Sequence, residues 1–130
     1  MTATDATSTV VAGKPTRTPD TITCLWFDGQ AEQAAQHYTA IFPNSRITNV
    51  THYGPGMPLP EGTVLTAEFT LDGQEYLGLN GGPDYTFSEA VSFQIMCADQ
   101  DEVDHYWDRL TDGGEEGPCA WLKDLSLIHI

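Results

Sequence analysis

The length of 130 residues gives room for one domain, and a hydrophobic fraction of 40% is typical of a globular chain. Five Lys and Arg residues against 19 Asp and Glu residues give a formal net charge of −14, which repels phosphate backbones and anionic lipid. We therefore expect neither nucleic acid nor a membrane as a partner. No run reaches the ~20 apolar residues of a membrane span. Cys24, Cys97 and Cys119 are widely spaced, which favours reduced thiols in a cytoplasmic protein.

The first 20 residues are rich in Thr, Ala, Asp and Pro and have no apolar periodicity. They also lack a basic flank followed by an apolar run, so they do not resemble a secretory signal. We interpret residues 1–20 as a disordered N-terminal tail.

A strand and a helix are predicted directly after this tail. The run TITCLWF, Thr21 to Phe27, is β-branched and aromatic, as in a buried strand. Asp28 offers a carboxylate that caps a helix, and apolar residues then recur with the helical period until Pro43 ends it. The apolar face consists of Ala31, Ala34, Ala35, Tyr38, Ile41 and Phe42.

Three strands are predicted next, at Arg46 to Tyr53, Gly62 to Leu71 and Gln74 to Asn80. Asp72 and Gly73 both tolerate a positive φ, so they predict a tight hairpin between the last two strands. The intervening segment from Tyr53 to Gly62 contains three Pro and three Gly residues and can only be a loop.

The same pattern then begins again. Val91 to Cys97 is predicted as a strand, and Asp99 with Glu102 forms a capping pair for a second helix over Asp101 to Leu110. Cys119 to Leu122 can begin another strand. The predicted order is β-α-β-β-β followed by β-α-β. Two such units would cover each other's bare faces by pairing around a shared cleft.

Three motifs resemble the PhnB-like family, labelled 3-demethylubiquinone-9 3-methyltransferase, of the vicinal-oxygen-chelate superfamily. They are LWFDGQAEQAAQHYTAIFPNSRI from Leu25, LNGGPDYTFSEAVSF from Leu79 and GGEEGPCAWLKD from Gly113. The resemblance implies an α+β domain over residues 21–124 in which paired βαβββ modules form a curved mixed sheet around a cleft. It also implies a homodimer. The family pattern stops after Asp124, so we expect residues 125–130 (LSLIHI) to be an atypical end and the second module to be truncated.

A metal site receives little support from these residues. Metal-using relatives place His, Gln or Glu ligands on the first and last strand of each module, and here ITCLWF, EYLGLN and VSFQIM contain no His. Because a first-row metal needs at least three converging ligands, we expect no bound metal or other cofactor. A divalent metal stays open as the alternative.

The sequence shows no residues typical of methyl transfer or of nucleophilic catalysis. The glycines lack the strand–turn–helix context of a methyl-donor site, and no Gly-x-Ser-x-Gly motif or Cys–His pair is present. The catalytic residues are therefore unknown, and whether the chain is an enzyme stays open.

A pocket for a small ligand is the remaining hypothesis. Aromatic rings and an amide lie where they can face the cleft, and rings bury a large area while an amide fixes orientation. The predicted binding residues are Trp26, Tyr76, Asn80, Phe87 and Trp121. We read the chain as a small-molecule-binding protein of the glyoxalase/bleomycin-resistance type. The alternatives are a metal-dependent lyase, isomerase or dioxygenase of the same superfamily, a domain with a vestigial cleft, and, least supported, a methyltransferase.

Overall fold

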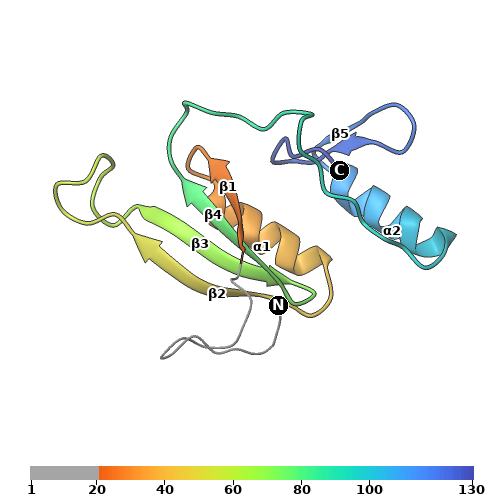
Figure 1. Ribbon diagram of the computed structural model, residues 1–130, viewed down its shortest axis with the longest axis horizontal. Helices are drawn as coiled ribbons and strands as arrows, with labels where there is room; N and C mark the ends of the chain where they lie inside the picture. The colour runs from red at the N-terminus through yellow and green to blue at the C-terminus, as the bar shows by residue number, and fades with distance from the viewer. Residues whose placement is uncertain (1–20) are drawn as a thin grey trace, which may run out of the picture.

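The computed structural model describes residues 21–130, so the predicted N-terminal tail lies outside the described residues. The elements of its first half are β1 (Thr23–Phe27), α1 (Ala31–Ile41), β2 (Ser45–His52), β3 (Val64–Leu71) and β4 (Gln74–Asn80). The four strands form one sheet in the order β1-β4-β3-β2 (Figure 1). Its first two neighbours, β1 and β4, are parallel, and the other pairs are antiparallel. The predicted α+β class and the strand–helix–three-strand order of this half are confirmed.

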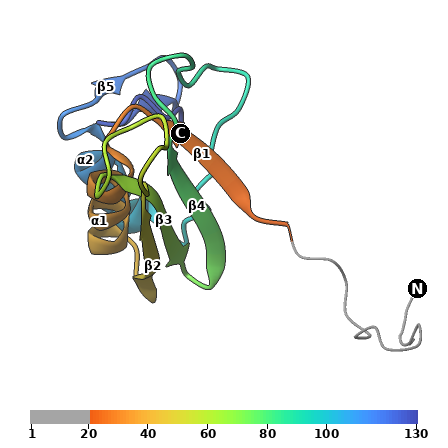
Figure 2. The same cartoon turned by 90° about the vertical axis from the view of Figure 1, so that its left-hand side faces the viewer.

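The predicted hairpin between β3 and β4 is also confirmed. Asp72 and Gly73 have φ angles of 49° and 84°, and the strands pair up to Leu71 opposite Gln74. Side chains alternate across the sheet, so Leu25, Phe27, Ala67 and Phe69 all point toward α1, which covers this face (Figure 2).

The start of α1 differs from the prediction. The helix begins at Ala31, after Gln30, and no side chain of the N-cap residue makes a capping hydrogen bond. The predicted Asp28 cap is wrong. Ala31 N donates instead to Oδ1 of Asn80, at 2.9 Å. The parallel pairing of β1 with β4 sets Asn80 beside Phe27, and this brings the amide to the helix end that follows β1.

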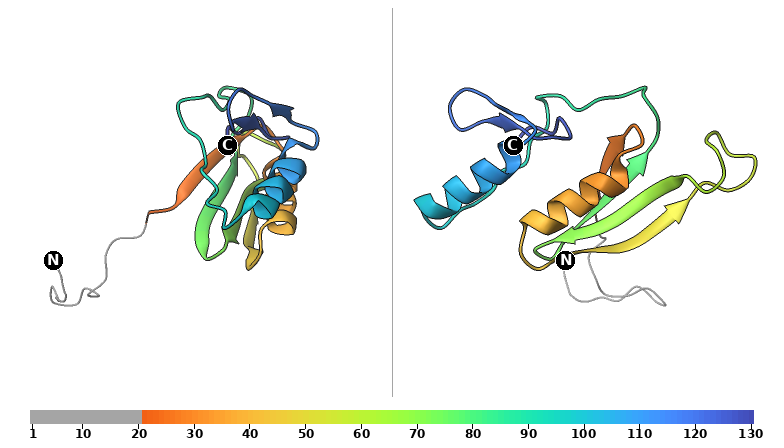
Figure 3. Two further views of the ribbon diagram at one scale, coloured as in Figure 1. Left: turned by 90° about the vertical axis from the view of Figure 1, so that its right-hand side faces the viewer. Right: turned by 180° about the vertical axis from the view of Figure 1, so that it is seen from behind.

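The second half contains α2 (Gln100–Thr111), β5 (Glu115–Glu116) and β6 (Leu122–Lys123). The predicted helix and its capping pair are confirmed: Asp99 Oδ1 accepts from Glu102 N at 2.9 Å, and Glu102 Oε1 accepts from Ala98 N at 2.7 Å. Both helices lie on the same side of the main sheet (Figure 3).

The predicted strand from Val91 to Cys97 is wrong. This segment contains no helix or strand, and within residues 21–130 its only pairing is an isolated bridge between Ser92 and His129, with Phe93 N donating to His129 O at 3.0 Å. No neighbouring strand of the described chain continues beside it, so no ladder forms. Of the predicted strand Cys119 to Leu122, only Leu122 is in β6.

The last six residues, 125–130, fold back against β6. Leu122 and Ile130 exchange two backbone hydrogen bonds, of 2.8 and 2.9 Å, and Asp124 N donates to Ile128 O at 3.0 Å. The turn places Leu127 at a positive φ of 69°. Ile128 is only 3% exposed, so this end belongs to the packed second half.

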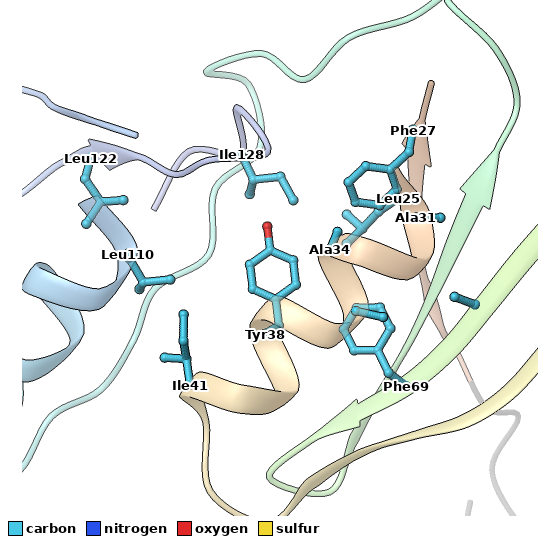
Figure 4. Packing of buried hydrophobic residues seen from close by; sticks show 12 residues of the cluster. Leu25, Phe27, Ala31, Ala34, Tyr38, Ile41, Phe69, Leu110, Leu122 and Ile128 are labelled. Carbon is cyan, nitrogen blue, oxygen red and sulfur yellow. The ribbon is translucent and has the colours of Figure 1, made fainter. Parts of the chain in front are cut away.

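The two halves share one hydrophobic core. Figure 4 shows Tyr38 and Ile41 of α1 lying between the sheet residues and the second-half residues Leu110 and Ile128. The buried apolar residues are Leu25, Phe27, Ala31, Ala34, Ala35, Tyr38, Ile41, Ala67, Phe69, Leu110, Leu122 and Ile128. This junction between the halves is where the candidate site forms.

Candidate functional site: an aromatic cavity between the two halves

A cavity of about 400 Å³ lies between the main sheet and the second half. We call it the aromatic cavity. The sheet contributes residues of β1, β3 and β4, α1 contributes its last turns, and the extended segment before α2 closes the other side. Its lining consists of Leu25, Tyr38, Phe42, Pro43, Phe69, Leu71, Asp72, Gln74, Tyr76, Phe93, Gln94, Ile95, Met96, Glu102, Tyr106 and Ile130.

Stacked rings make up the walls of the aromatic cavity. Phe69 stacks on Tyr38 and on Tyr76, with ring centroids 6.1 and 5.4 Å apart, and Tyr76 meets Phe93 edge-on at 5.6 Å. Across the cavity Phe42 stacks on Tyr106 at 5.1 Å. Such pairs hold the rings in fixed orientations, so the apolar walls are preformed. Burial raises the pKa of Tyr76, whose phenol therefore stays protonated at neutral pH.

The polar groups in the lining are few and carry one sign of charge. Asp72 and Glu102 contribute carboxylates, Gln74 and Gln94 contribute amides, and within residues 21–130 no Lys, Arg or His lines the cavity. A negatively charged ligand would thus find no counter-charge there, whereas amides and carboxylates accept hydrogen bonds from neutral or cationic groups.

A buried hydrogen-bonded pair, Tyr38 and Asp124, joins the two halves next to this cavity. The Tyr38 hydroxyl donates to Oδ2 of Asp124, and Oδ1 accepts from the backbone N–H groups of Ser126 and Ile128 at 2.9 and 3.0 Å. Asp124 is 0% exposed. Burial raises the pKa of the Asp124 carboxyl, and the hydrogen bond from Tyr38 opposes part of this rise.

The same pair fixes the protonation of the tyrosine. Burial, together with the Asp124 carboxylate, raises the pKa of Tyr38 far above its ordinary range. Its hydroxyl therefore acts as a structural donor to Asp124 and is not available as a base. The sequence reasoning treated Tyr38 only as core and did not identify Asp124. The one signal in the sequence was an acidic residue beside the apolar residues of the run WLKDLSLIHI.

Among the predicted binding residues, Tyr76 alone lines the aromatic cavity. Phe87 packs edge-on against Phe27, at 5.3 Å, and lines a smaller pocket of about 200 Å³. Trp121 is 50% exposed beside α2 and lines a separate groove. The structure therefore does not bring these three residues together in one hollow.

The other two predicted residues, Trp26 and Asn80, line none of these three hollows. Trp26 points to the sheet face opposite α1, where Nε1 donates to Gly82 O at 2.8 Å and the ring meets Tyr85 edge-on at 4.9 Å. Asn80 is 1% exposed. Its amide caps α1 and donates from Nδ2 to Val64 O at 3.1 Å, so its hydrogen bonds are made within the protein.

Comparison with known proteins identifies the family. A family model described as 3-demethylubiquinone-9 3-methyltransferase matches residues 19–126. The chain belongs to this family. No curated protein matches the sequence.

Solved structures with a similar fold include the PhnB protein of Bacillus cereus, described provisionally as a 3-demethylubiquinone-9 3-methyltransferase. It is 31% identical, with a TM-score of 0.73, and the alignment covers 85% of this chain and 95% of that one. The protein PA1353 of Pseudomonas aeruginosa is 15% identical over 86% and 94% of the two chains, with a TM-score of 0.66, and shows the fold alone.

The family description raises the question of a methyl-donor site at Gly81 and Gly82. A Cβ atom at Gly81 would lie 2.3 Å from the Trp26 ring, so the indole covers this turn. The residues that follow it are irregular up to α2 at Gln100, and no helix begins there. A donor site of the glycine-rich type needs an open turn that leads into a helix N-terminus, and this turn has neither feature.

Two further observations concern the described residues. Within residues 21–130 no three His, Cys, Asp or Glu side chains gather closely enough to hold a metal ion. Neither helix of this part of the chain is long and apolar enough to cross a membrane.

Proposed function

We propose that this chain is a small-molecule-binding protein of the glyoxalase/bleomycin-resistance type and that the aromatic cavity is its ligand site. The observation that carries the proposal is the cavity itself. Its volume of about 400 Å³ falls in the range of small-molecule sites, and its walls combine fixed aromatic rings with a few polar groups.

The lining also favours one class of ligand. Six aromatic residues offer flat apolar surfaces, and the charged groups at the edge of the cavity, Asp72 and Glu102, are both acidic. We therefore expect a flat, largely apolar ligand that is neutral or carries a positive charge. An anionic ligand of the same shape would bind more weakly, because no basic side chain of residues 21–130 lines the cavity to compensate its desolvation.

Membership of the superfamily rests on the order of the elements. The β-α-β-β-β unit of the first half and the partial repeat around α2 fit a paired-module domain. The likeness to the B. cereus PhnB protein, at 31% identity and a TM-score of 0.73, supports the fold of this domain. We assign no reaction to the site, because the tyrosine hydroxyl nearest to a carboxylate, that of Tyr38, is committed to Asp124.

Dye binding tests this proposal. Purified full-length protein should bind the neutral dye Nile red with increased fluorescence and bind the anionic dye ANS more weakly. Gln74→Trp places a large ring on an exposed residue at the edge of the cavity, and we expect it to weaken Nile red binding by about tenfold, or about 1.4 kcal/mol.

The matched control is Gln36→Trp, at another exposed glutamine, which lies on α1 and lines neither the aromatic cavity nor the groove beside Trp121. It should bind the dye like the wild type. Equal binding by the Gln74→Trp and wild-type proteins would show that the dye does not enter the aromatic cavity, and the proposed site would then be abandoned.

A further inference from the structure

The apolar face of α2 is covered over only part of its length. Val103, Tyr106, Trp107 and Leu110 recur with the helical period, yet within α2 only Leu110 is buried. Val103 is 42% exposed, and Tyr106 and Trp107 are half-buried. The apolar face of α1, by contrast, is buried from Ala31 to Ile41. An open apolar face of this kind is typical of a binding groove.

A groove of about 470 Å³ lies along this open face of α2. Its other walls are the segment from Ser92 to Cys97 and the turn that leads into β6, where Trp121 is 50% exposed. Figures 1 and 3 show that segment lying beside α2. The volume falls in the range of small-molecule sites, so the groove can hold part of a ligand.

The groove adjoins the aromatic cavity. Phe93, Gln94, Ile95 and Tyr106 line both hollows. Tyr106 also stacks on Phe42 in the wall of the aromatic cavity, so its ring stands where the two hollows meet. A ligand bound in the aromatic cavity can therefore extend past Tyr106 into the groove.

The polar groups of the two hollows differ, and this difference indicates what the groove binds. The edge of the aromatic cavity has the carboxylates of Asp72 and Glu102, whereas within residues 21–130 no charged side chain lines the groove. An ionic group placed in the groove would lose its hydration without gaining a counter-charge. An uncharged apolar chain loses no such hydration and gains from burial. The groove therefore favours an apolar occupant over a charged peptide or protein segment.

We propose that the ligand of this chain is a flat ring that carries an apolar chain, with the ring in the aromatic cavity and the chain in the groove along α2. This inference rests on the proposed function and adds the second part of the ligand to it. The ring packs among the fixed aromatic side chains of the cavity. The chain covers the exposed apolar surface of Val103 and Trp121 and removes it from water.

Calorimetric titration of the full chain with 4-alkylphenols, from the methyl to the octyl compound, tests the proposal. These probes are uncharged at neutral pH and differ only in the length of the chain. Affinity should rise about two- to fourfold with each added methylene while the chain enters the groove. It should level off once the groove is filled. A site for the ring alone would bind all the probes with equal affinity.

Two variants obstruct the groove and leave the aromatic cavity open. Val103→Trp and Ala120→Trp each enlarge an exposed residue that lines the groove and does not line the aromatic cavity. Both should keep the affinity for 4-methylphenol and weaken the binding of 4-octylphenol by about tenfold or more. Val91→Trp is the matched control, at a valine that is 68% exposed and lines neither hollow. It should bind every probe like the wild type.

Gln74→Trp separates this inference from the proposed function, because it obstructs the aromatic cavity and should weaken all the alkylphenols by the same factor. If 4-methylphenol binds and longer chains add no affinity, the inference is overturned and the aromatic cavity stands as a site for a ring. If no alkylphenol binds, both fall. A gain with chain length that persists in both groove variants would also overturn the inference. So would a dimer in sedimentation velocity that Val103→Trp dissociates, because a second copy would then occupy the groove.

Discussion

The two halves of the molecule hold their backbones in different ways. In residues 21–80 four strands pair into one sheet, with register shifts between β2 and β3, and α1 covers one face of this sheet. In residues 81–130 the strands β5 and β6 have two residues each, and the segment from Gly81 to Asp99 contains no strand. Each half nevertheless contains a helix: α1 packs on the sheet, and α2 is capped by Asp99. Helical hydrogen bonds are local, so α2 forms without a large sheet, whereas a strand needs a partner.

This comparison implies that the first half carries more of the stability. Phe69→Ala removes a ring that is 1% exposed and stacks on both Tyr38 and Tyr76, and it should lower the free energy of unfolding by about 3–5 kcal/mol. Leu110→Ala, at a residue of α2 that is 0% exposed, should cost less, about 2–3 kcal/mol, because the second half relaxes more easily around the cavity.

Urea denaturation followed by intrinsic fluorescence measures both losses. Met57→Ala, in an exposed loop, is the control and should change stability by no more than about 0.5 kcal/mol. A loss in Leu110→Ala equal to that in Phe69→Ala would show that the second half is packed as rigidly as the first.

The hydrogen bond between Tyr38 and Asp124, which joins the two halves, can be removed by deleting one hydroxyl group. Tyr38→Phe removes the hydroxyl that donates to the buried Asp124 carboxyl, and it should destabilise the protein by about 1.5–3 kcal/mol at pH 7. Hydrogen exchange should increase at the Leu122 and Ile128 amides, which lie on the second-half side of this contact. If the loss is the same in an Asp124→Ala background, where residue 124 can no longer accept from the hydroxyl, the effect does not pass through Asp124.

Two variants compare the tertiary cap of α1, Asn80, with the local cap that the sequence predicted, Asp28. Asn80→Ala leaves the N–H of Ala31 and the C=O of Val64 without their partner, and it should cost about 1–2 kcal/mol. Asp28→Ala, at the residue that the sequence pattern favours, should cost less than about 0.5 kcal/mol. Thermal unfolding of the two variants measures the difference. A larger loss of stability in Asp28→Ala than in Asn80→Ala would show that Asp28 is the cap of α1.

Asp124→Asn should change stability little at neutral pH. Burial raises the pKa of Asp124 above its ordinary value of 3.8, so the folded state holds this proton to higher pH than the unfolded state does. The contribution of Asp124 to the free energy of unfolding therefore falls as pH rises from 3.8 through its folded-state pKa. Asp124→Asn removes this decrease. At pH 7 its stability should stay within about 1 kcal/mol of the wild type, because the amide can still bond to Ser126, Ile128 and Tyr38.

Urea midpoints of the two proteins across the acidic range test this sign. The difference between wild type and Asp124→Asn is the useful quantity, because the many other carboxyl groups titrate in both. A wild-type stability that rises relative to Asp124→Asn as pH increases would show that the hydrogen bonds to Asp124 outweigh its burial.

The sequence by itself determined the elements whose signals are local. The 3.6-residue period and a capping pair gave α2, the apolar period up to Pro43 gave α1, and Asp72-Gly73 gave the hairpin between β3 and β4. Three motifs also indicated the family to which the chain belongs. These features depend on residues within about one turn or one hairpin of each other, so a linear pattern records them.

The tertiary structure decided the features that join distant residues. Asn80 caps a helix 49 positions earlier in the chain, and Tyr38 donates to Asp124 across 86 positions. The aromatic cavity likewise combines Phe42 of α1 with Tyr106 of α2. The segment 91–97 has the composition of a strand but no continuous neighbour with which to pair. A strand and a cavity wall both depend on which other segment lies alongside, and that is set by packing and chain topology.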